Sequence, residues 1–121
     1  MRGRERGAKE QGEKEDMITD EQAERASDFI RFNADRAAAA KANRIYLEEF
    51  RKSKKAILIQ QADKGTVQEK ESFAYAHLDY IAILEGLKAA VEEEERLRWM
   101  MVAAQTKIEV WRTENANSRR G

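Results

Sequence analysis

Apolar side chains recur at alternating steps of three and four residues from Phe73 to Trp111, and this heptad pattern constrains the fold more than any other feature. The first core position of the heptad is occupied by Phe73, Tyr80, Leu87, Glu94, Met101 and Ile108, and the second by Ala76, Ile83, Ala90, Leu97, Ala104 and Trp111. So long a repeat is typical of a helix that packs along a coiled-coil seam. Glu94 is the polar exception, and a polar residue in such a seam can fix the register or the number of subunits at a cost in stability.

The segment before this helix carries signals for a helix boundary. Gly65 is suited to the left-handed conformation that ends a helix, and Thr66 with Glu69 fits a capping box. The sequence therefore predicts a second helix over about residues 67–114. Ser72 or Asp79 could cap a restarted helix, so a count of three helices stays open.

The first helix is predicted over about residues 20–61, because Thr19 and Gln22 fit a capping box at its start. Its expected core face comprises Ala23, Ala26, Ile30, Ala34, Ala37, Ala38, Ala42, Tyr46, Phe50 and Ile57, with Ser53 completing the stripe. A short glycine-containing link between two helices favours antiparallel neighbours. The predicted fold class is all-α: a long antiparallel helical hairpin whose second helix is a coiled coil.

Two helices of this size cannot hide two apolar faces from water by themselves, so we expect a homo-oligomer. The expected oligomer interface comprises Phe73, Tyr80, Ile83, Leu87, Glu94, Leu97, Met101, Ile108 and Trp111. Residues 18–114 form the predicted hairpin domain. A charged N-terminal arm (1–17) and a polar tail (115–121) are expected to be disordered, because they have little to bury.

Residues that could carry catalytic chemistry are sparse. The chain has no cysteine, and its one histidine, His77, lies two residues from Asp79, a spacing that separates side chains on a helix. The sequence contains no glycine-rich phosphate loop, zinc-ligand spacing or Glu-x-x-His pattern. We therefore expect no enzymatic activity, metal, cofactor or small-molecule substrate.

The hydropathy and charge of the chain point to the cytoplasm. No apolar run approaches the roughly 18 residues of a membrane span, and the N-terminus lacks the apolar stretch of a secretory signal. Lys+Arg 23 balances Asp+Glu 23, so any binding of nucleic acid must come from a local basic patch.

Such a patch is present in the first helix: Arg51, Lys52, Lys54 and Lys55, with Lys41 and Arg44 upstream. We expect these cations to share an outward side while Phe50 and Ile57 point to the core. A cationic ridge repeated in an oligomer could track a phosphate backbone. The alternative is a solvated face whose lysine stems cover apolar surface. A second basic group that could contact nucleic acid comprises Lys107, Arg112, Arg119 and Arg120.

The stretch FRKSKKAIL, the glycine turn and TVQEKESFAYAHLDYIAILEGLKAAVEEEERLRWMMVAAQTKIEVWRTENANSR together resemble small helical proteins of tailed bacteriophages, often encoded beside recombination and replication genes. The layout from Thr19 to Asn115 is similar to the UvsY-type recombination mediators of T-even phages. The resemblance implies an oligomer in the bacterial host cytoplasm that binds single-stranded DNA, with a recombinase or single-strand-binding protein as partner.

From the DNA-contacting helix of that family we carry over Arg51, Lys52, Lys54 and Lys55. The acidic run Glu92–Glu95 departs from the pattern, because it would repel DNA if it faced the same surface. The alternative function is a helical structural or adaptor protein, such as a virion-assembly scaffold or a protein-binding hairpin, without a nucleic-acid role.

Overall fold

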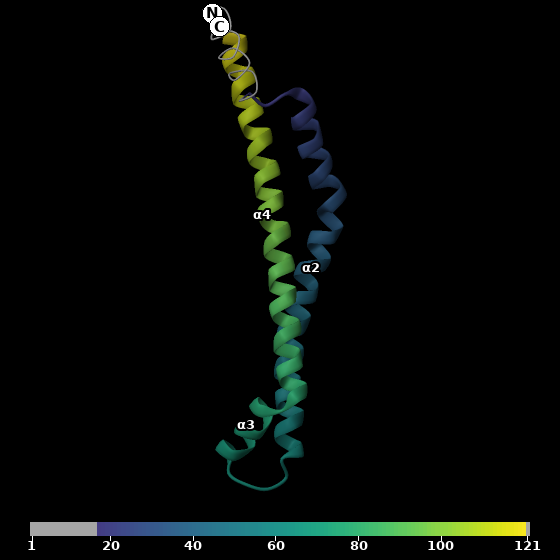
Figure 1. Ribbon diagram of the computed structural model, residues 1–121, viewed down its shortest axis with the longest axis vertical. Helices are drawn as coiled ribbons and strands as arrows, with labels where there is room; N and C mark the ends of the chain where they lie inside the picture. Colours follow the sequence, from purple (N-terminus) through teal and green to yellow (C-terminus); the bar gives the residue numbers. More distant parts are fainter. Residues whose placement is uncertain (1–16, 121) are drawn as a thin grey trace, which may run out of the picture. The chain divides into compact units, whose positions relative to one another are not determined.

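The computed structural model describes residues 17–120, apart from the side chain of Arg120. This part of the chain is all-helical and contains no strand. It forms three helices, two of them long: α2 (Asp20–Gln61), α3 (Val67–Ala76) and α4 (Leu78–Arg120), shown in Figure 1. The predicted N-terminal arm lies outside the described residues, except for Met17.

The ends of α2 and the start of α3 follow from local hydrogen bonds. At the start of α2, the Thr19 amide donates to Gln22 Oε1 at 3.0 Å, and the Gln22 amide donates to Thr19 Oγ1 at 3.1 Å. Gly65 has a φ of 120°, which favours glycine, and Thr66 Oγ1 accepts from the Glu69 amide at 3.1 Å. The bounds predicted for the first helix and the start of the second agree with these elements.

The predicted second helix is broken at His77, so the described chain has three helices, which is the alternative that the sequence left open. His77 has an extended backbone (φ −68°, ψ 136°) and separates α3 from α4. Its Nδ1 accepts a hydrogen bond from the Asp79 amide at 3.0 Å, so His77 caps α4 in place of the expected Ser72 or Asp79. At the other end, α4 continues to Arg120, whereas residues 115–121 were predicted to be a frayed tail.

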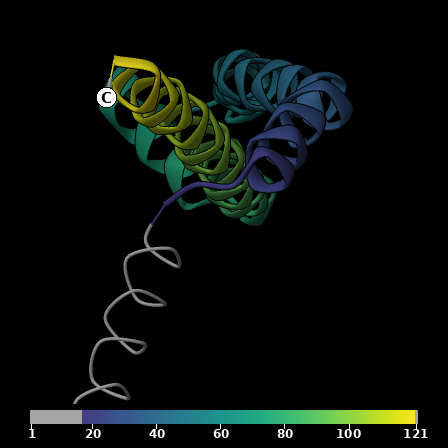
Figure 2. The same cartoon turned by 90° about the horizontal axis from the view of Figure 1, so that it is seen from above.

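The chain divides into two compact units. Among the described residues, unit 1 contains 17–34 and 99–120. Within it, Trp111 Nε1 donates a hydrogen bond to Asp20 Oδ1 at 2.8 Å. The Ile18 amide donates to Glu114 Oε2 at 2.9 Å. Ile18 lies just before α2, whose first turns are purple in Figure 2. The apolar contacts of this unit rest on small side chains, because its buried residues are Ala23, Ala26 and Ala104.

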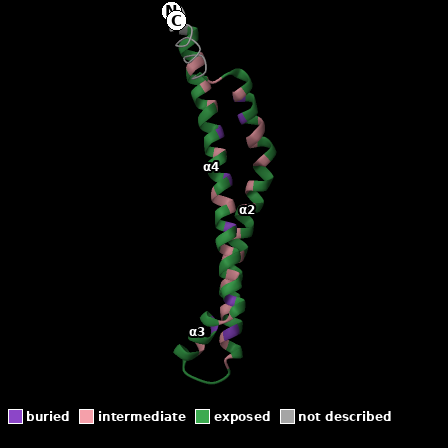
Figure 3. Ribbon diagram, viewed as in Figure 1, coloured by how far each residue is buried: buried purple, intermediate pink, exposed green. Residues whose placement is uncertain are grey.

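Unit 2 contains Asp35–Arg98 and holds the one cluster of large buried side chains in the described chain. Leu58 of α2 packs with Ala74 of α3 and Tyr80 of α4, and Ile59 lies against them. Figure 3 shows how few residues are fully buried along each helix. The three helices therefore meet at one small apolar cluster. Elsewhere along the described helices few side chains are fully buried.

The predicted heptad face of α4 is its inward face from Tyr80 onward. The buried members are Tyr80, Ala90, Leu97 and Ala104, and the half-buried ones are Ile83, Leu87, Glu94, Met101, Ile108 and Trp111. The first two predicted members, Phe73 and Ala76, are exposed, because they lie on α3 before the break at His77.

Beyond Ile30 the predicted core face of α2 is wrong, except at Ala37. The inward residues of α2 are Ala23, Ala26, Ile30, Asn33, Ala37, Ala40, Arg44, Leu47, Arg51, Lys54 and Leu58, whereas Ala34, Ala38, Ala42, Tyr46, Phe50, Ser53 and Ile57 are exposed. Each step of four residues advances a side chain by about 40° around the axis. The series predicted from Ala34 to Phe50 takes such steps, so it moves to the other side of the helix.

Candidate functional site

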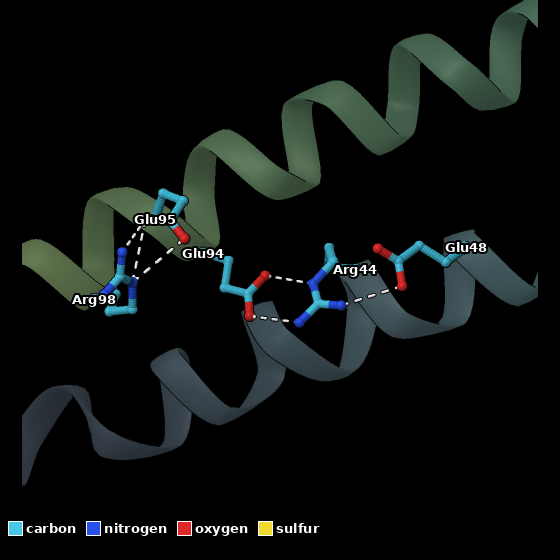
Figure 4. A network of polar contacts seen from close by, with 5 residues as sticks. All are labelled: Arg44, Glu48, Glu94, Glu95 and Arg98. Carbon is cyan, nitrogen blue, oxygen red and sulfur yellow. Dashed lines mark hydrogen bonds and ion pairs between the residues drawn. The ribbon is translucent and has the colours of Figure 1, made fainter.

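Unit 2 also contains a row of ion pairs between α2 and α4, which we call the charged seam. It is built around Arg44 and Glu94 (Figure 4). Arg44 Nε donates to Glu94 Oε2 at 2.6 Å, and Arg44 Nη2 donates to Glu94 Oε1 at 3.0 Å. Arg44 also donates to Glu48 one turn away at 3.1 Å. The Arg44 and Glu94 side chains are only 24% and 18% exposed. This two-point contact fixes the orientation of both groups more tightly than a single ion pair would.

The pairing shifts the pKa of both partners toward the charged state. The hydrogen bond from Arg44 lowers the pKa of Glu94, although partial burial opposes the shift. The hydrogen bond to Glu94 raises the pKa of Arg44 in turn. Glu94 was predicted to be a polar residue in a seam between chains, but its partner is an arginine of the same chain.

Two other ion pairs extend the seam along unit 2. Arg36 Nη2 lies 2.8 Å from Glu93 Oε1, and Lys54 Nζ lies 3.4 Å from Asp79 Oδ2. The Glu93 carboxylate also accepts from Arg96 one turn further along α4, and that bond is the largest cause of its lowered pKa. Two members of the acidic run of α4, Glu93 and Glu94, therefore pair with arginines of α2.

The six predicted DNA-binding residues are divided by the structure. Arg44 and Lys54 are half-buried in the seam, and Lys55 donates to the Tyr75 hydroxyl with its Nζ 4.5 Å from that ring's centroid. Lys52 is exposed and pairs with Glu49 at 3.3 Å. Arg51 is half-buried and Lys41 exposed, and neither forms an ion pair or side-chain hydrogen bond with the described residues.

The expected outward orientation of the ridge is therefore reversed for three of its six members. Arg44, Arg51 and Lys54 lie on the inward face of α2, whereas Phe50 and Ile57, expected in the core, are exposed. For Arg44 and Lys54 the cause is an opposite charge on α4, because Glu94 and Asp79 supply partners that sequence spacing along α2 does not reveal.

Large apolar side chains remain on the outside of unit 2. On α2, Tyr46 is 63% exposed, Ile57 45% and Phe50 38%, and the Tyr46 and Phe50 rings stack with centroids 5.9 Å apart and an interplanar angle of 5°. On α4, Ile81, Leu84 and Val91 are exposed as well. Sequence reasoning missed the outward face of α2, because it assigned those residues to the core.

Of the nine residues expected in the oligomer interface, two are buried within the single chain and six are half-buried. Leu97 is almost fully buried, and Tyr80 belongs to the cluster with Leu58. Phe73 is the exposed member, because it lies on α3.

The described residues contain no cluster of three or more histidine, aspartate or glutamate side chains placed to hold a metal ion. No helix in the described part of the chain has the length and apolarity needed to cross a membrane. His77 serves as a helix cap and has an edge-on contact with Phe73, with ring centroids 5.8 Å apart.

Comparisons with protein-family models, with curated proteins and with solved structures gave no match to this chain.

Proposed function

We propose that this chain is a non-enzymatic structural or adaptor protein that acts by self-association, with an antiparallel helical hairpin as its building block. The observation that carries the proposal is the exposure of large apolar side chains on both long helices of unit 2. They comprise Tyr46, Phe50 and Ile57 on α2 and Ile81, Leu84 and Val91 on α4. Exposed patches of large apolar side chains mark interaction sites on soluble proteins.

The antiparallel arrangement is supported by the order of the ion pairs in unit 2. Arg36 pairs with Glu93, whereas Lys54, later in the sequence, pairs with Asp79, earlier in the sequence. The alternating apolar positions of α4 support a coiled-coil type of packing along the same helix. We expect the charged seam to set the register within the chain, and the apolar outward faces to bind other copies.

Sedimentation velocity across a concentration series tests this function. We expect the purified protein to be at least a dimer at micromolar concentration and to dissociate on dilution. Circular dichroism should report high helicity throughout, because the helices are held by contacts within the chain. A helical monomer at every concentration up to hundreds of micromolar would contradict the proposal.

Single-stranded DNA binding is the second candidate function, and one observation favours it. Lys41 and Arg51 form no ion pair among the described residues, although the charge of Lys41 acts on Glu94, and Lys52 pairs with Glu49 only at the surface. Exposed ion pairs contribute little, so phosphate groups could displace them. A DNA-bound oligomer could then recruit a recombinase or a single-strand-binding protein.

A fluorescence titration with labelled single-stranded DNA at two salt concentrations tests this second candidate. Replacing Lys41, Arg51 and Lys52 together by alanine should lower the affinity by about tenfold or more and flatten its salt dependence, because fewer counterions are released. The matched control replaces Lys107 and Arg112. Absence of binding by the wild-type protein at low salt would exclude this candidate, and loss only in the control would move the contact to the second basic group.

A further inference from the structure

The outward face of α2 has a pattern that fits a second copy of itself. We define the outward stripe as Ala42, Tyr46, Phe50, Ser53 and Ile57, which recur at steps of four and three along one side of α2 and are all exposed. All five lie in unit 2, on a helix whose opposite face holds the charged seam. The stripe is therefore free for a partner without disturbing the contacts that hold the unit together.

The residues before and after Phe50 in the sequence carry charges of opposite sign. The sequence reads Glu48-Glu49-Phe50-Arg51-Lys52, with two acids before the phenylalanine and two bases after it. Glu49 and Lys52 are the members on the flank of the outward stripe. They pair with each other at 3.3 Å, and their side chains are 67% and 65% exposed. A weak, exposed pair of this kind can exchange partners when another helix approaches.

The sizes of the stripe residues are also complementary about Phe50. Tyr46 and Ser53 lie on opposite sides of Phe50 at nearly equal distances along the sequence, and so do Ala42 and Ile57. If a second α2 runs in the opposite direction, the large Tyr46 meets the small Ser53, and Ile57 meets Ala42. Large side chains opposite small ones allow two helices to interdigitate.

We propose that two copies of this chain pair through the outward stripes of their α2 helices, antiparallel, around a two-fold axis near Phe50. In a two-fold dimer both chains use the same surface patch. When the two helices are antiparallel, one flank of the first helix lies against the same flank of the second. Glu49 then faces Lys52 of the second copy, and each pair occurs twice. This inference rests on the proposed self-association and names the surface that performs it.

The size of the stripe sets the expected strength of the dimer. Ala42 to Ile57 spans about 22 Å of helix at 1.5 Å per residue. A single helix face of that length gives a small interface, so the expected dissociation constant is on the order of micromolar. The charges on the flanks of the two stripes balance, because each chain supplies one acid, Glu49, and one base, Lys52.

Charge reversal tests the pairing directly. Glu49→Lys places two lysines on the flank, and Lys52→Glu places two glutamates there. Each variant alone should dimerise roughly tenfold more weakly than the wild type, because like charges then face each other twice. An equimolar mixture of the two variants should recover the wild-type affinity as a heterodimer, and the double variant Glu49→Lys/Lys52→Glu should recover it as a homodimer. Sedimentation equilibrium measures all four, and a mixture no tighter than the single variants overturns the proposal.

A second pair of variants locates the apolar surface. Phe50→Glu should abolish dimerisation at micromolar concentration while leaving helicity unchanged. Val91→Glu is the matched control, because Val91 on α4 has the same exposure of 38%. Dissociation by Val91→Glu but not by Phe50→Glu places the interface on α4: this inference then fails, and the proposed self-association stands. A wild-type protein that is monomeric at every concentration refutes both.

The natural absence of cysteine makes the helix direction measurable. Ala42→Cys and Ile57→Cys chains should each form few disulfide dimers when oxidised alone, and should cross-link efficiently when mixed, because antiparallel pairing brings position 42 against position 57. A disulfide requires Cα atoms within about 7 Å. Efficient cross-linking of each variant with itself, and none in the mixture, indicates parallel helices and overturns the antiparallel assignment.

Discussion

Leu58 and Ile57 are adjacent in the sequence, but only Leu58 is buried, and substituting each by alanine tests the observed face of α2. Leu58 is fully buried between Ala74 and Tyr80, whereas Ile57 is 45% exposed. Truncating a buried leucine to alanine costs about 2–5 kcal/mol. The cluster around Leu58 is small and lies near solvent, so it can partly collapse into the space left behind. We therefore expect Leu58→Ala to lower the free energy of unfolding by about 2–3 kcal/mol.

That loss is a large fraction of the roughly 5–15 kcal/mol that stabilises a typical domain. The same change at Ile57 removes a side chain that already contacts water, so Ile57→Ala should cost within about 1 kcal/mol. Urea titrations followed by circular dichroism at 222 nm measure both variants. They should be run at low micromolar and at high protein concentration, because Ile57 lies in the outward stripe and its effect should grow with dimerisation, whereas that of Leu58 should not. Equal losses at low concentration, or a larger loss for Ile57→Ala, would refute the observed orientation of α2.

Three further predictions concern the seam and the link. Arg44 holds the pKa of Glu94 in the folded protein below the ordinary value of 4.5. The pair therefore stabilises the folded state at neutral pH. This contribution is lost as the pH falls below 4.5 and then through the pKa of Glu94 in the folded state. Glu94→Gln should flatten this part of the acid-unfolding profile measured by circular dichroism, and an unchanged profile would contradict the role of the seam. Thr66→Ala removes the cap of α3 and should cost about 1 kcal/mol in urea titrations, with Thr66→Asp as the variant that retains the cap. Gly65→Ala should cost about 1–3 kcal/mol, because the φ of 120° at this position strains any residue with a side chain; no loss would show that the link adopts another conformation.

The helix boundaries could be read from the sequence because their causes are local. Thr19 with Gln22 and Thr66 with Glu69 each form their capping contact within one helical turn. The break at His77 was harder to place, because an imidazole acceptor is an uncommon cap and the residues around it favour helix on both sides.

The inward face of α4 could also be predicted, because most of its seam positions from Tyr80 onward carry apolar side chains whose burial is favourable beside any partner. The inward face of α2 gave no such signal. Between Ala37 and Lys54 it contains alanines, one leucine and three cations, while the larger apolar residues Tyr46 and Phe50 lie on the other side.

Only the tertiary structure decided which face of α2 turns inward. Arginine and lysine can lie half-buried at Arg44 and Lys54 because Glu94 and Asp79 on α4 face them, and those partners are remote in the sequence. Periodicity along one helix measures the preference of its side chains for water, but not the charges on the helix opposite. Since an opposite charge stabilises a half-buried cation, the orientation of α2 depends on both helices together.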